Sequence, residues 1–580
     1  MTMKRIAVII MMVSACITMR AQTRYAPFRP LPNENQLRWQ NMEMYAFIHY
    51  SLNTYTDQEW GFGNEDLKLF NPSDLDCRQW ARVCKQAGMK GIIFTAKHHC
   101  GFCMWPSAYT EYSVKNTPWK NGKGDVVREL ADACREEGLK FAVYLSPWDR
   151  NHKDYGRPEY VTYFRNQLRE LLTNYGEIFE VWFDGANGGD GWYGGANETR
   201  KIDGKTYYGW AETFRMIREL QPKAVIWNDG GDRGDLRWVG TEAGNVGETN
   251  WSLMLSKGET PWHMLHYGVE DGDVWCPGET NTSIRPGWFY HETENEHVKS
   301  LSKLMDTYYK SVGRNSTLLL NFPIAPNGRI HPNDSLRGIA FKKMIDEVFK
   351  TNLVEKAKIQ TKASETIIDF GKPTVFNRFL AEEDIALGQR VKKFTLEALV
   401  DGKWQSLKDA LVEDGKDGLT TIGHRRIICF PTIKATKLRF TITDAKAEPI
   451  IKKMGVYLAP ELNADIPNSG EKKSSGLHIF FSSPTQMMID WDKEQTITSF
   501  RYLPPHNTKD GTITHYTLWA SSDWSNWTKL ASGEFSNIVN NPIWQAIKFS
   551  ATKARILKFD AERLAAGERM AFGDIEVVTE

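Results

Sequence analysis

The first half of the chain alternates short apolar runs with longer segments in which apolar residues recur at helical spacing. The runs that predict buried strands are residues 45–49, 91–95, 141–145, 178–183 and 224–227. The segments that predict helices between them are residues 79–87, 126–137, 160–175 and 210–220. Strands that alternate with helices in this way indicate a parallel sheet.

Glycines mark the ends of three predicted helices. Gly88, Gly138 and Gly176 each precede the next strand, where a left-handed helix C-cap is expected. Residues 40–352 leave room for eight strand–helix units, so we expect an α/β fold of the (β/α)8, or TIM-barrel, type. A doubly wound sheet is the alternative, but the glycine-rich phosphate-binding loops typical of it are missing after the first strands.

The pattern changes after residue 352. Short alternating runs such as 393–399 and 437–443 are separated by turn residues, which predicts all-β structure. Residues 461–473 lie in a stretch rich in Pro, Asn, Ser and Gly and read as a linker. We therefore expect a barrel domain over 22–354 and two β-sandwich domains over 355–460 and 474–580.

The N-terminus has the pattern of a secretory signal peptide over residues 1–21. Lys4 and Arg5 precede an apolar run that is too short to span a bilayer, and cleavage is expected after Ala21. The alternative is a lipid anchor at Cys16, because residues 13–16 resemble a bacterial lipobox. No other stretch indicates a membrane span, so we expect a secreted or periplasmic bacterial protein.

Composition narrows the possible functions. Lys and Arg number 73 and Asp and Glu 72, so the basic excess of a nucleic-acid-binding protein is missing. Seven cysteines follow Ala21, an odd number that argues against a disulfide scaffold, and the lone Cys100-x-x-Cys103 pair is a weak zinc or redox signal. Most of the 21 tryptophans precede residue 289, which suits a large core or a surface that binds flat ligands.

Polar side chains follow the predicted strands at the ends where barrels of this type carry their chemistry. They are His49, His98, His99, Tyr144, Ser146, Trp148, Asp184, Asn228, Asp229 and, after a sixth predicted strand at 236–240, Glu242. Adjacent side chains of a strand point to opposite faces, so His98 and His99 are better placed to bind ligand hydroxyls than to share a metal.

Two carboxylates at the mouth of a barrel indicate glycoside hydrolysis, in which one attacks the sugar or activates water and the other protonates the leaving oxygen. Asp184 precedes a glycine-rich loop, so a helix-capping role is less favoured. Glu242 is the preferred partner, and Glu248 and Glu279 are its rivals. Alternatives to this function are a sugar-binding protein with an inactive barrel and a barrel glycosidase for another sugar, such as galactose.

Several motifs in order resemble the α-L-fucosidases of glycoside hydrolase family 29. They are Phe47-Ile-His-Tyr50, Gln58-Glu-Trp60, Ala96-Lys-His-His-Cys-Gly-Phe102, Val143-Tyr-Leu-Ser146 and Val181-Trp-Phe-Asp-Gly185. The resemblance covers about residues 30–352. The Trp-Phe-Asp-Gly and Gly-Thr-Glu-Ala-Gly segments are most similar to the subgroup that prefers α-1,3/1,4-linked fucose, as in Lewis-type glycans.

This resemblance implies a retaining mechanism without metal or cofactor, in which Asp184 is the nucleophile and Glu242 the acid/base. The residues that it implies for fucose binding are His49, Glu59, Trp60, His98, His99, Tyr144, Arg285 and Trp288. Retention requires the two carboxyl groups to lie about 5–5.5 Å apart. Cys100 stands where the family usually has Asp after the histidine pair, so hydrogen bonding there is expected to differ.

The last domain resembles the discoidin-like (F5/8 type C) carbohydrate-binding sandwiches. The segments that carry the resemblance are residues 497–502, 516–522, 524–527 and 573–576. It implies either sugar binding or a spacer role, and the preceding β domain is expected to brace the barrel. The expected partners of the protein are fucosylated glycans, and its oligomeric state stays open.

Overall fold

The structure is a computed structural model, which describes residues 25–185, 197–228, 233–257, 260–412, 416–460, 478–505 and 508–579. The predicted signal peptide, Cys16, the linker and Asp229 lie outside these ranges. None of the helices within them combines the length and the apolar character needed to cross a membrane.

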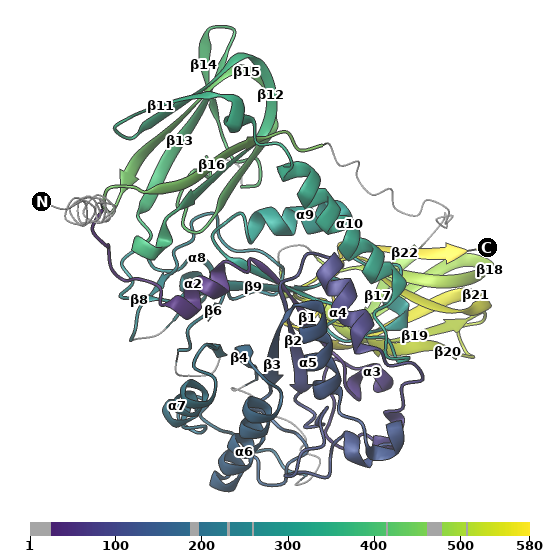
Figure 1. The fold of residues 1–580 in the computed structure, drawn as a ribbon. Helices are drawn as coiled ribbons and strands as arrows, with labels where there is room; N and C mark the ends of the chain where they lie inside the picture. Colours follow the sequence, from purple (N-terminus) through teal and green to yellow (C-terminus); the bar gives the residue numbers. More distant parts are fainter. Residues whose placement is uncertain are drawn as a thin grey trace, which may run out of the picture.

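Eight parallel strands form a near-closed, TIM-like barrel, which confirms the barrel prediction (Figure 1). They are β1 (Met44–Ile48), β2 (Gly91–Lys97), β3 (Lys140–Leu145), β4 (Ile178–Phe183), β5 (Val225–Asn228), β6 (Arg237–Trp238), β9 (Gly278–Ser283) and β10 (Thr317–Asn321). Their order is β5-β4-β3-β2-β1-β10-β9-β6, and over the described ranges no hydrogen-bonded ladder closes β5 onto β6. The carboxyl ends of these strands therefore meet at one rim of the barrel.

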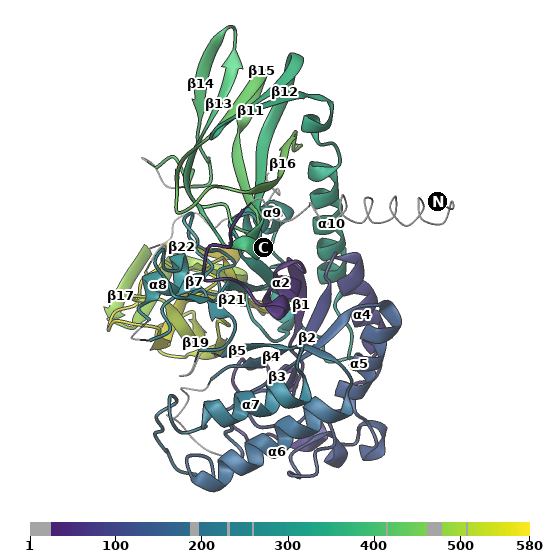
Figure 2. The same cartoon turned by 60° about the vertical axis from the view of Figure 1, so that its left-hand side comes forward.

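Helices surround this sheet. They are α2 (Glu34–Gln40), α3 (Asn53–Thr56), α4 (Cys77–Gln86), α5 (Val126–Glu137), α6 (Pro158–Asn174), α7 (Trp210–Leu220), α8 (Trp262–Tyr267), α9 (Leu301–Lys310) and α10 (Pro332–Phe349). Among them, α4, α5, α6 and α7 can be followed along the outside of the sheet in Figure 2. The Asp125 carboxylate caps α5 by accepting from Arg128 N at 2.9 Å, and Gly138 ends it in the left-handed conformation. The described residues between β5 and β6 form no helix, so the barrel departs from regular eightfold alternation.

Short elements complete this half of the chain. A small hairpin of β7 (Leu253–Met254) and β8 (Val274–Trp275) lies between β6 and β9. The 3₁₀ turns there are η1 (Leu67–Leu69), η2 (Val114–Asn116), η3 (Trp119–Gly122), η4 (Glu292–Glu294) and η5 (Leu353–Lys356), and a sixth, η6 (Ile385–Leu387), lies in the following β domain.

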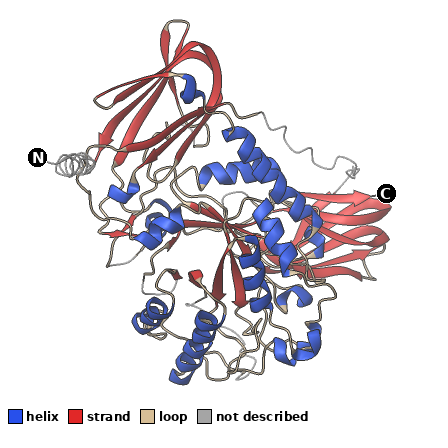
Figure 3. Ribbon diagram, in the orientation of Figure 1, coloured by secondary structure: helices blue, strands red, loops and turns tan. Residues whose placement is uncertain are grey.

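Two antiparallel β domains follow, and they consist almost entirely of strands (Figure 3). The middle β domain contains β11 (Lys358–Lys362), β12 (Glu365–Glu383), β13 (Val391–Val400), β14 (Lys403–Leu407), β15 (Arg426–Ala445) and β16 (Ile451–Tyr457). The last β domain contains β17 (His478–Ser483), β18 (Gln486–Leu503), β19 (Ile513–Ser521), β20 (Thr528–Glu534), β21 (Gln545–Leu564) and β22 (Asp574–Thr579). Each domain has its own hydrophobic core.

The two β domains share one topology. Counted within each domain, the strand order is 1-2-5-3-4, and the sixth strand pairs with the second. In both, the ladder between strands two and five is interrupted near its middle, at Asp369/Thr374 and at Asp490/Gln495. The chain therefore carries two copies of one kind of β unit, and equivalent loops of the two copies can be compared.

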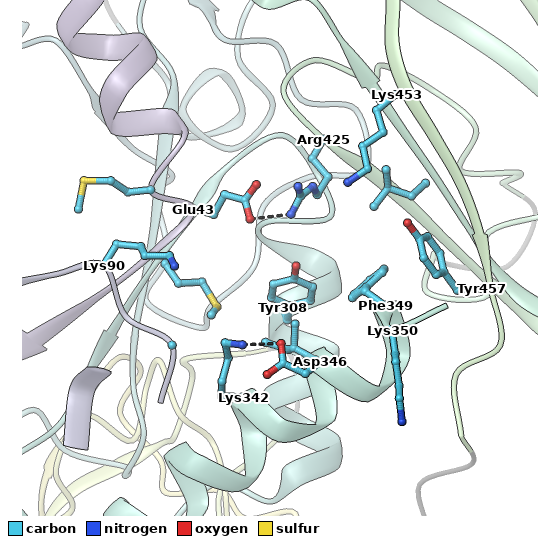
Figure 4. A pocket seen from close by; sticks show the side chains of 15 residues that line it. Glu43, Lys90, Tyr308, Lys342, Asp346, Phe349, Lys350, Arg425, Lys453 and Tyr457 are labelled. Atoms are coloured by element: carbon cyan, nitrogen blue, oxygen red, sulfur yellow. Dashed lines mark hydrogen bonds and ion pairs between the residues drawn. The ribbon is translucent and has the colours of Figure 1, made fainter. Parts of the chain in front are cut away.

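The middle β domain is attached at the amino ends of the barrel strands, away from the rim where the strands end. A cavity of about 420 Å³ lies there, between the start of β1, α10 and the middle domain (Figure 4). Beside it, Arg425 bridges the domains by donating to Glu43 at 2.6 Å and to Glu382 at 2.7 Å. Partly buried charge bridges of this kind fit the expected bracing role.

Candidate active site

A pocket of about 1,050 Å³ opens at the carboxyl ends of the barrel strands, and both the barrel and the last β domain line it. The residues predicted from the sequence that line it are His49, Glu59, Trp60, His98, His99, Asp184, Glu242 and Trp288. They come from three strand ends and three loops that are distant in sequence. The fold therefore brings together eight of the ten predicted site residues in one cavity.

Asp184 lies at the carboxyl end of β4, with its side chain partly open to the pocket. The Tyr144 hydroxyl donates to Asp184 Oδ2 at 3.2 Å, and His99 Nε2 lies 3.8 Å from the same oxygen. Gly185 follows with φ 74°, and a Cβ there would lie 2.5 Å from the His99 ring. The turn after β4 thus needs glycine to bring the carboxylate and the imidazole close together.

Three imidazoles line the same cavity as Asp184. Burial lowers the pKa of His49 to about 4 and of His99 to about 3, and it lowers the pKa of His98 well below the ordinary value. His49 Nδ1 pairs with Asn321 Oδ1 at 2.9 Å, and His99 Nδ1 pairs with Ser146 Oγ at 2.7 Å. Uncharged rings held in this way suit hydrogen bonding to the hydroxyls of a neutral ligand.

Glu242 lies in the loop after β6, and one of its hydrogen-bond partners, Asn540, is 298 residues away in the sequence. Its Oε2 accepts from Trp288 Nε1 at 3.1 Å and from Asn540 Nδ2 of the last β domain at 2.7 Å. Burial raises the pKa of Glu242, and the side chains of Trp288, Asn537 and Asn540 oppose part of that rise. The site therefore holds a carboxyl group that is biased toward its protonated form.

The two rivals of Glu242 do not line the pocket. Glu279 is fully buried inside the barrel, where it accepts from the Tyr45 hydroxyl and from Trp182 Nε1 at 2.7 Å. Glu248 forms an ion pair with Lys416 of the middle β domain at 2.7 Å. Of the three candidates, Glu242 alone can reach a ligand in this cavity.

Glu59 is buried at the pocket wall and fixes the loop that carries Trp288. Its carboxylate accepts from the backbone N–H groups of Trp288 and Phe289 at 2.9 and 3.0 Å, and it pairs with His291 Nε2 at 2.9 Å. Burial alone would lower the pKa of His291, but its hydrogen bonds to the Asp57 and Glu59 carboxylates and the nearby charges of Glu294 and Glu59 raise that pKa well above its ordinary value. Glu59 therefore supports the indole that contacts Glu242, in addition to facing the pocket.

Aromatic rings form the remaining walls. Trp60 is 58% exposed and meets Trp148 edge to face at 5.6 Å between ring centroids. Trp182 stacks on Trp227 at 3.6 Å, and both line the cavity. Such flat apolar faces can cover the C–H side of a sugar ring.

Two predicted residues do not line the cavity. Arg285 is fully buried, donates to Asp334 at 2.8 Å and to His291 O at 3.3 Å, and so lies behind the pocket wall. The expected contact between Arg285 and the ligand is not found in this geometry, because a buried guanidinium pairs with the nearby carboxylate. Tyr144 is also buried, and it reaches the site through its bond to Asp184.

Several residues that line the cavity were not predicted from the sequence. Trp227 ends a predicted strand and could have been found by the same rule that identified Asp184. Asn281 lies on β9, whose polar sequence gave no strand signal. The lining residues of the last β domain, which include Phe535 and Asn540, carry no signal in the sequence that connects them to the barrel.

The Cys100-x-x-Cys103 pair packs against the back of the site. Both thiols are buried and free, and burial raises the pKa of Cys100 to about 12. Cys100 Sγ lies 3.4 Å from Asn53 Oδ1, while Cys103 Sγ accepts from Gln167 Nε2 at 3.2 Å. Thiols held protonated in this way do not favour redox chemistry. In the described ranges, no group of three or more His, Cys, Asp or Glu side chains is arranged to hold a metal ion.

Comparison with known proteins identifies the family. The α-L-fucosidase family matches residues 25–340, which is more than half of the chain. This chain belongs to the α-L-fucosidase family. Alpha-L-fucosidase 1 of Arabidopsis thaliana is 38% identical over 471 residues, which cover 74% of this chain and 88% of the plant protein. The F5/8 type C domain family matches residues 472–572, as its resemblance predicted.

Solved structures agree with this assignment. A glycoside hydrolase 29 family member from an unknown rumen bacterium is 83% identical, with a TM-score of 0.76 over 96% of this chain and 100% of that chain. A putative α-L-fucosidase from Bacteroides ovatus is 39% identical, with a TM-score of 0.67 over 95% of this chain and 96% of that chain. A Ruminococcus gnavus GH29 fucosidase solved in complex with fucose is 30% identical over 76% of this chain and 97% of that chain, with a TM-score of 0.67. The protein is thus an α-L-fucosidase, a glycoside hydrolase with a TIM-like barrel.

Proposed function

We propose that this α-L-fucosidase is a retaining exo-enzyme that releases terminal α-1,3/1,4-linked L-fucose from Lewis-type oligosaccharides or glycoproteins. The observation that supports it best is the contrast between two carboxyl groups in one pocket. Asp184 is partly open and receives a Tyr144 hydrogen bond, whereas burial raises the pKa of Glu242. Opposed environments of this kind favour a nucleophile and a proton donor, respectively.

In the proposed first step, Asp184 attacks the anomeric carbon and forms a fucosyl ester as the glycosidic C–O bond breaks. Glu242 gives its proton to the departing oxygen, so the leaving sugar departs neutral. In the second step, Glu242 takes a proton from water as the water attacks the same carbon. That attack releases fucose with its original anomeric configuration and restores both carboxyl groups.

Fucose recognition is proposed to use neutral donors and acceptors and aromatic faces. His49, His98 and His99 would bind hydroxyls as uncharged imidazoles, and Trp60 and Trp288 would pack against the C–H face and the C5 methyl group. Because the sugar is uncharged, no electrostatic steering is needed, and the formal net charge of +1 agrees with this.

The N-terminal pattern supports a further proposal, that the enzyme is secreted or periplasmic. A bacterial lipid anchor at Cys16 is the alternative. N-terminal sequencing of the mature protein distinguishes a chain that begins after Ala21 from one with a modified cysteine.

The function is tested with a panel of four fucosylated trisaccharides linked α-1,2, α-1,3, α-1,4 and α-1,6, together with an aryl α-L-fucoside. The proposal predicts release of α-fucose, observed by proton NMR before mutarotation, from the 1,3 and 1,4 linkages first. Initial release of β-fucose contradicts the retaining mechanism, and faster cleavage of the 1,2 or 1,6 linkage contradicts the linkage assignment. An aryl galactoside serves as the control for a different sugar specificity.

A further inference from the structure

We infer that the last β domain is a working part of the active site. The loop between β20 and β21 positions the Glu242 side chain, and together with residues 563–565 it forms the subsite for the leaving sugar. This inference rests on the proposed function, in which Glu242 protonates the leaving oxygen. It gives the discoidin-like domain a role within the catalytic pocket, distinct from that of a separate sugar-binding module.

Buried polar contacts anchor this loop to the barrel at both of its ends. Ser536 donates its hydroxyl to Glu294, whose other carboxylate oxygen accepts from Gly287 N at 3.2 Å. At the far end, Asn541 accepts from Lys299 Nζ at 2.8 Å and donates to Pro286 O at 3.1 Å. Because buried polar groups are costly to separate from their partners, these contacts hold the loop in one place on the barrel.

Between the anchors, the chain forms a tight turn that presents an amide to Glu242. Asn540 N donates to Asn537 O at 3.0 Å, and the Asn540 side chain donates both to Asn537 Oδ1 at 2.8 Å and to Glu242 Oε2 at 2.7 Å. Asn537 has φ 47°, a left-handed conformation that is uncommon outside glycine. Sparsely populated conformations of this kind concentrate at functional sites, where the surrounding contacts hold them in place.

The chemistry of the contact suits a carboxyl group that must gain and lose a proton. An amide donates without titrating, so it orients Glu242 without adding a charge that would hold the carboxylate ionised. Asn540 and Trp288 both donate to Oε2. Oε2 is thus occupied as an acceptor, which assigns the transferable proton to Oε1.

The position of the loop also defines where the leaving sugar lies. Glu242 must reach the glycosidic oxygen, so the sugar on the far side of that oxygen lies next to Glu242 and the loop that holds it. The last domain contributes apolar faces there, from Phe535, Val539 and Leu564, and the polar side chain of Arg563. The whole cavity, about 1,050 Å³, is at the upper end of the usual range for ligand pockets and has room beyond one deoxyhexose.

The middle β domain makes an equivalent contact with the same barrel segment. Its loop between β14 and β15 corresponds in topology to the loop between β20 and β21. Thr421 Oγ1 accepts from Asn250 N at 2.9 Å, and the Thr420 and Thr249 hydroxyls pair at 2.8 Å. The two copies of one β unit therefore hold residues 242–250 through matching loops.

The test uses the full-length enzyme and compares kcat/KM on a Lewis trisaccharide with kcat/KM on an aryl fucoside whose leaving group needs no protonation. Asn540→Ala is expected to lower the trisaccharide value at least tenfold more than the aryl value. It should also move the basic limb of the pH profile upward, because a donor to the ionised carboxylate is lost. Asn526→Ala is the matched control, since Asn526 is exposed in the same domain and bonds only to Asp523 among the hydrogen bonds of its side chain in the described ranges.

A second variant keeps the test decisive if Asn540→Ala alters folding. Ala565 lines the cavity and is exposed, so Ala565→Trp adds bulk to the leaving-sugar subsite without changing the barrel. It is expected to raise the trisaccharide KM at least tenfold relative to the aryl KM. Equal factors on both substrates, with an unmoved pH profile, would overturn the inference. A wild-type enzyme that releases no fucose from any substrate would instead refute the proposed function itself.

Discussion

Replacing Trp288 with phenylalanine removes an indole donor to Glu242 while an aromatic ring remains in the pocket wall. The lost bond joins Trp288 Nε1 to Glu242 Oε2 at 3.1 Å. The ring can still pack on Phe47 and His49, whose centroids lie 6.0 and 5.3 Å away. The Glu59 carboxylate bonds to the backbone N–H of residue 288, so the loop position does not depend on the indole.

The size of the effect follows from the kind of bond that is lost. Hydrogen bonds to charged groups contribute about 1.5–3 kcal/mol, and the lower end applies because this one is long and only partly buried. Loss of about 1.5 kcal/mol from the ionised form alone raises the proton affinity of Glu242 roughly tenfold. The pKa of Glu242 is already raised by burial, and the Trp288 bond opposes that rise, so the substitution moves it further upward.

The assay is the pH dependence of kcat/KM on a fucosylated trisaccharide, in which the basic limb reports the proton donor of the free enzyme. The basic limb of Trp288→Phe should lie about one pH unit above that of the wild type. Trp519→Phe is the matched control, because it removes an indole bond of 2.9 Å to Asp560 in the last domain, outside the pocket. A basic limb that stays in place in folded Trp288→Phe would refute the assignment of Glu242 as the proton donor.

Three further predictions concern the groups behind the pocket. Tyr144→Phe removes the 3.2 Å bond to Asp184 but keeps the ring, so kcat/KM should fall about tenfold with an unchanged melting temperature. Glu180 lies on β4, is buried, and accepts from Trp39 Nε1 at 2.9 Å. Burial raises the pKa values of Glu180 and Glu279, so the stability that their protonated forms provide is complete below the ordinary carboxyl pKa and is lost as pH rises above it. Glu180→Gln should therefore flatten the fall in melting temperature with rising pH. Burial also raises the pKa of Cys100 to about 12, so native protein at pH 8 should not be alkylated there by iodoacetamide, as peptide mapping will show.

Residues that follow apolar strands could be placed from the sequence with good accuracy. His49 and Asp184 were identified because the carboxyl ends of parallel strands converge, and the observed ends of β1 and β4 lie within one residue of the predicted ones. The predicted helix at 126–137 coincides with α5, since an Asp cap and a left-handed glycine mark its two ends.

The failures have equally specific causes. Strand β9 is polar along its whole length although it is fully buried. The sequence therefore contains no apolar run that predicts this strand, and the position of Glu279 inside the barrel could not be predicted. The family resemblance implied that Arg285 contacts the ligand, but the direction of a loop side chain depends on partners such as Asp334 that only the fold supplies. Asn540 contacts Glu242 because the last β domain packs against the barrel, and the hydrophobic pattern of a sequence does not predict how two domains pack together.

The shared topology of the two β domains could not be predicted from the sequence, for a related reason. Strand order depends on which segments pair, and the loops between strands differ in length and sequence in the two copies. Only the pattern of ladders shows that the loop before β15 and the loop before β21 are equivalent. That equivalence connects the bracing role of the middle domain with the active-site role inferred for the last one.

The proposed mechanism requires that Asp184 attacks the sugar and carries it as a covalent ester. It is tested most directly by incubating the enzyme with a fluorinated fucosyl fluoride, which slows the second step, and then mapping the labelled peptide by mass spectrometry. The wild-type enzyme is expected to carry one fucosyl adduct per chain, on Asp184, and Asp184→Asn is expected to carry none. A stable adduct on another carboxylate, or turnover of the reagent with initial release of an inverted product, would contradict this mechanism.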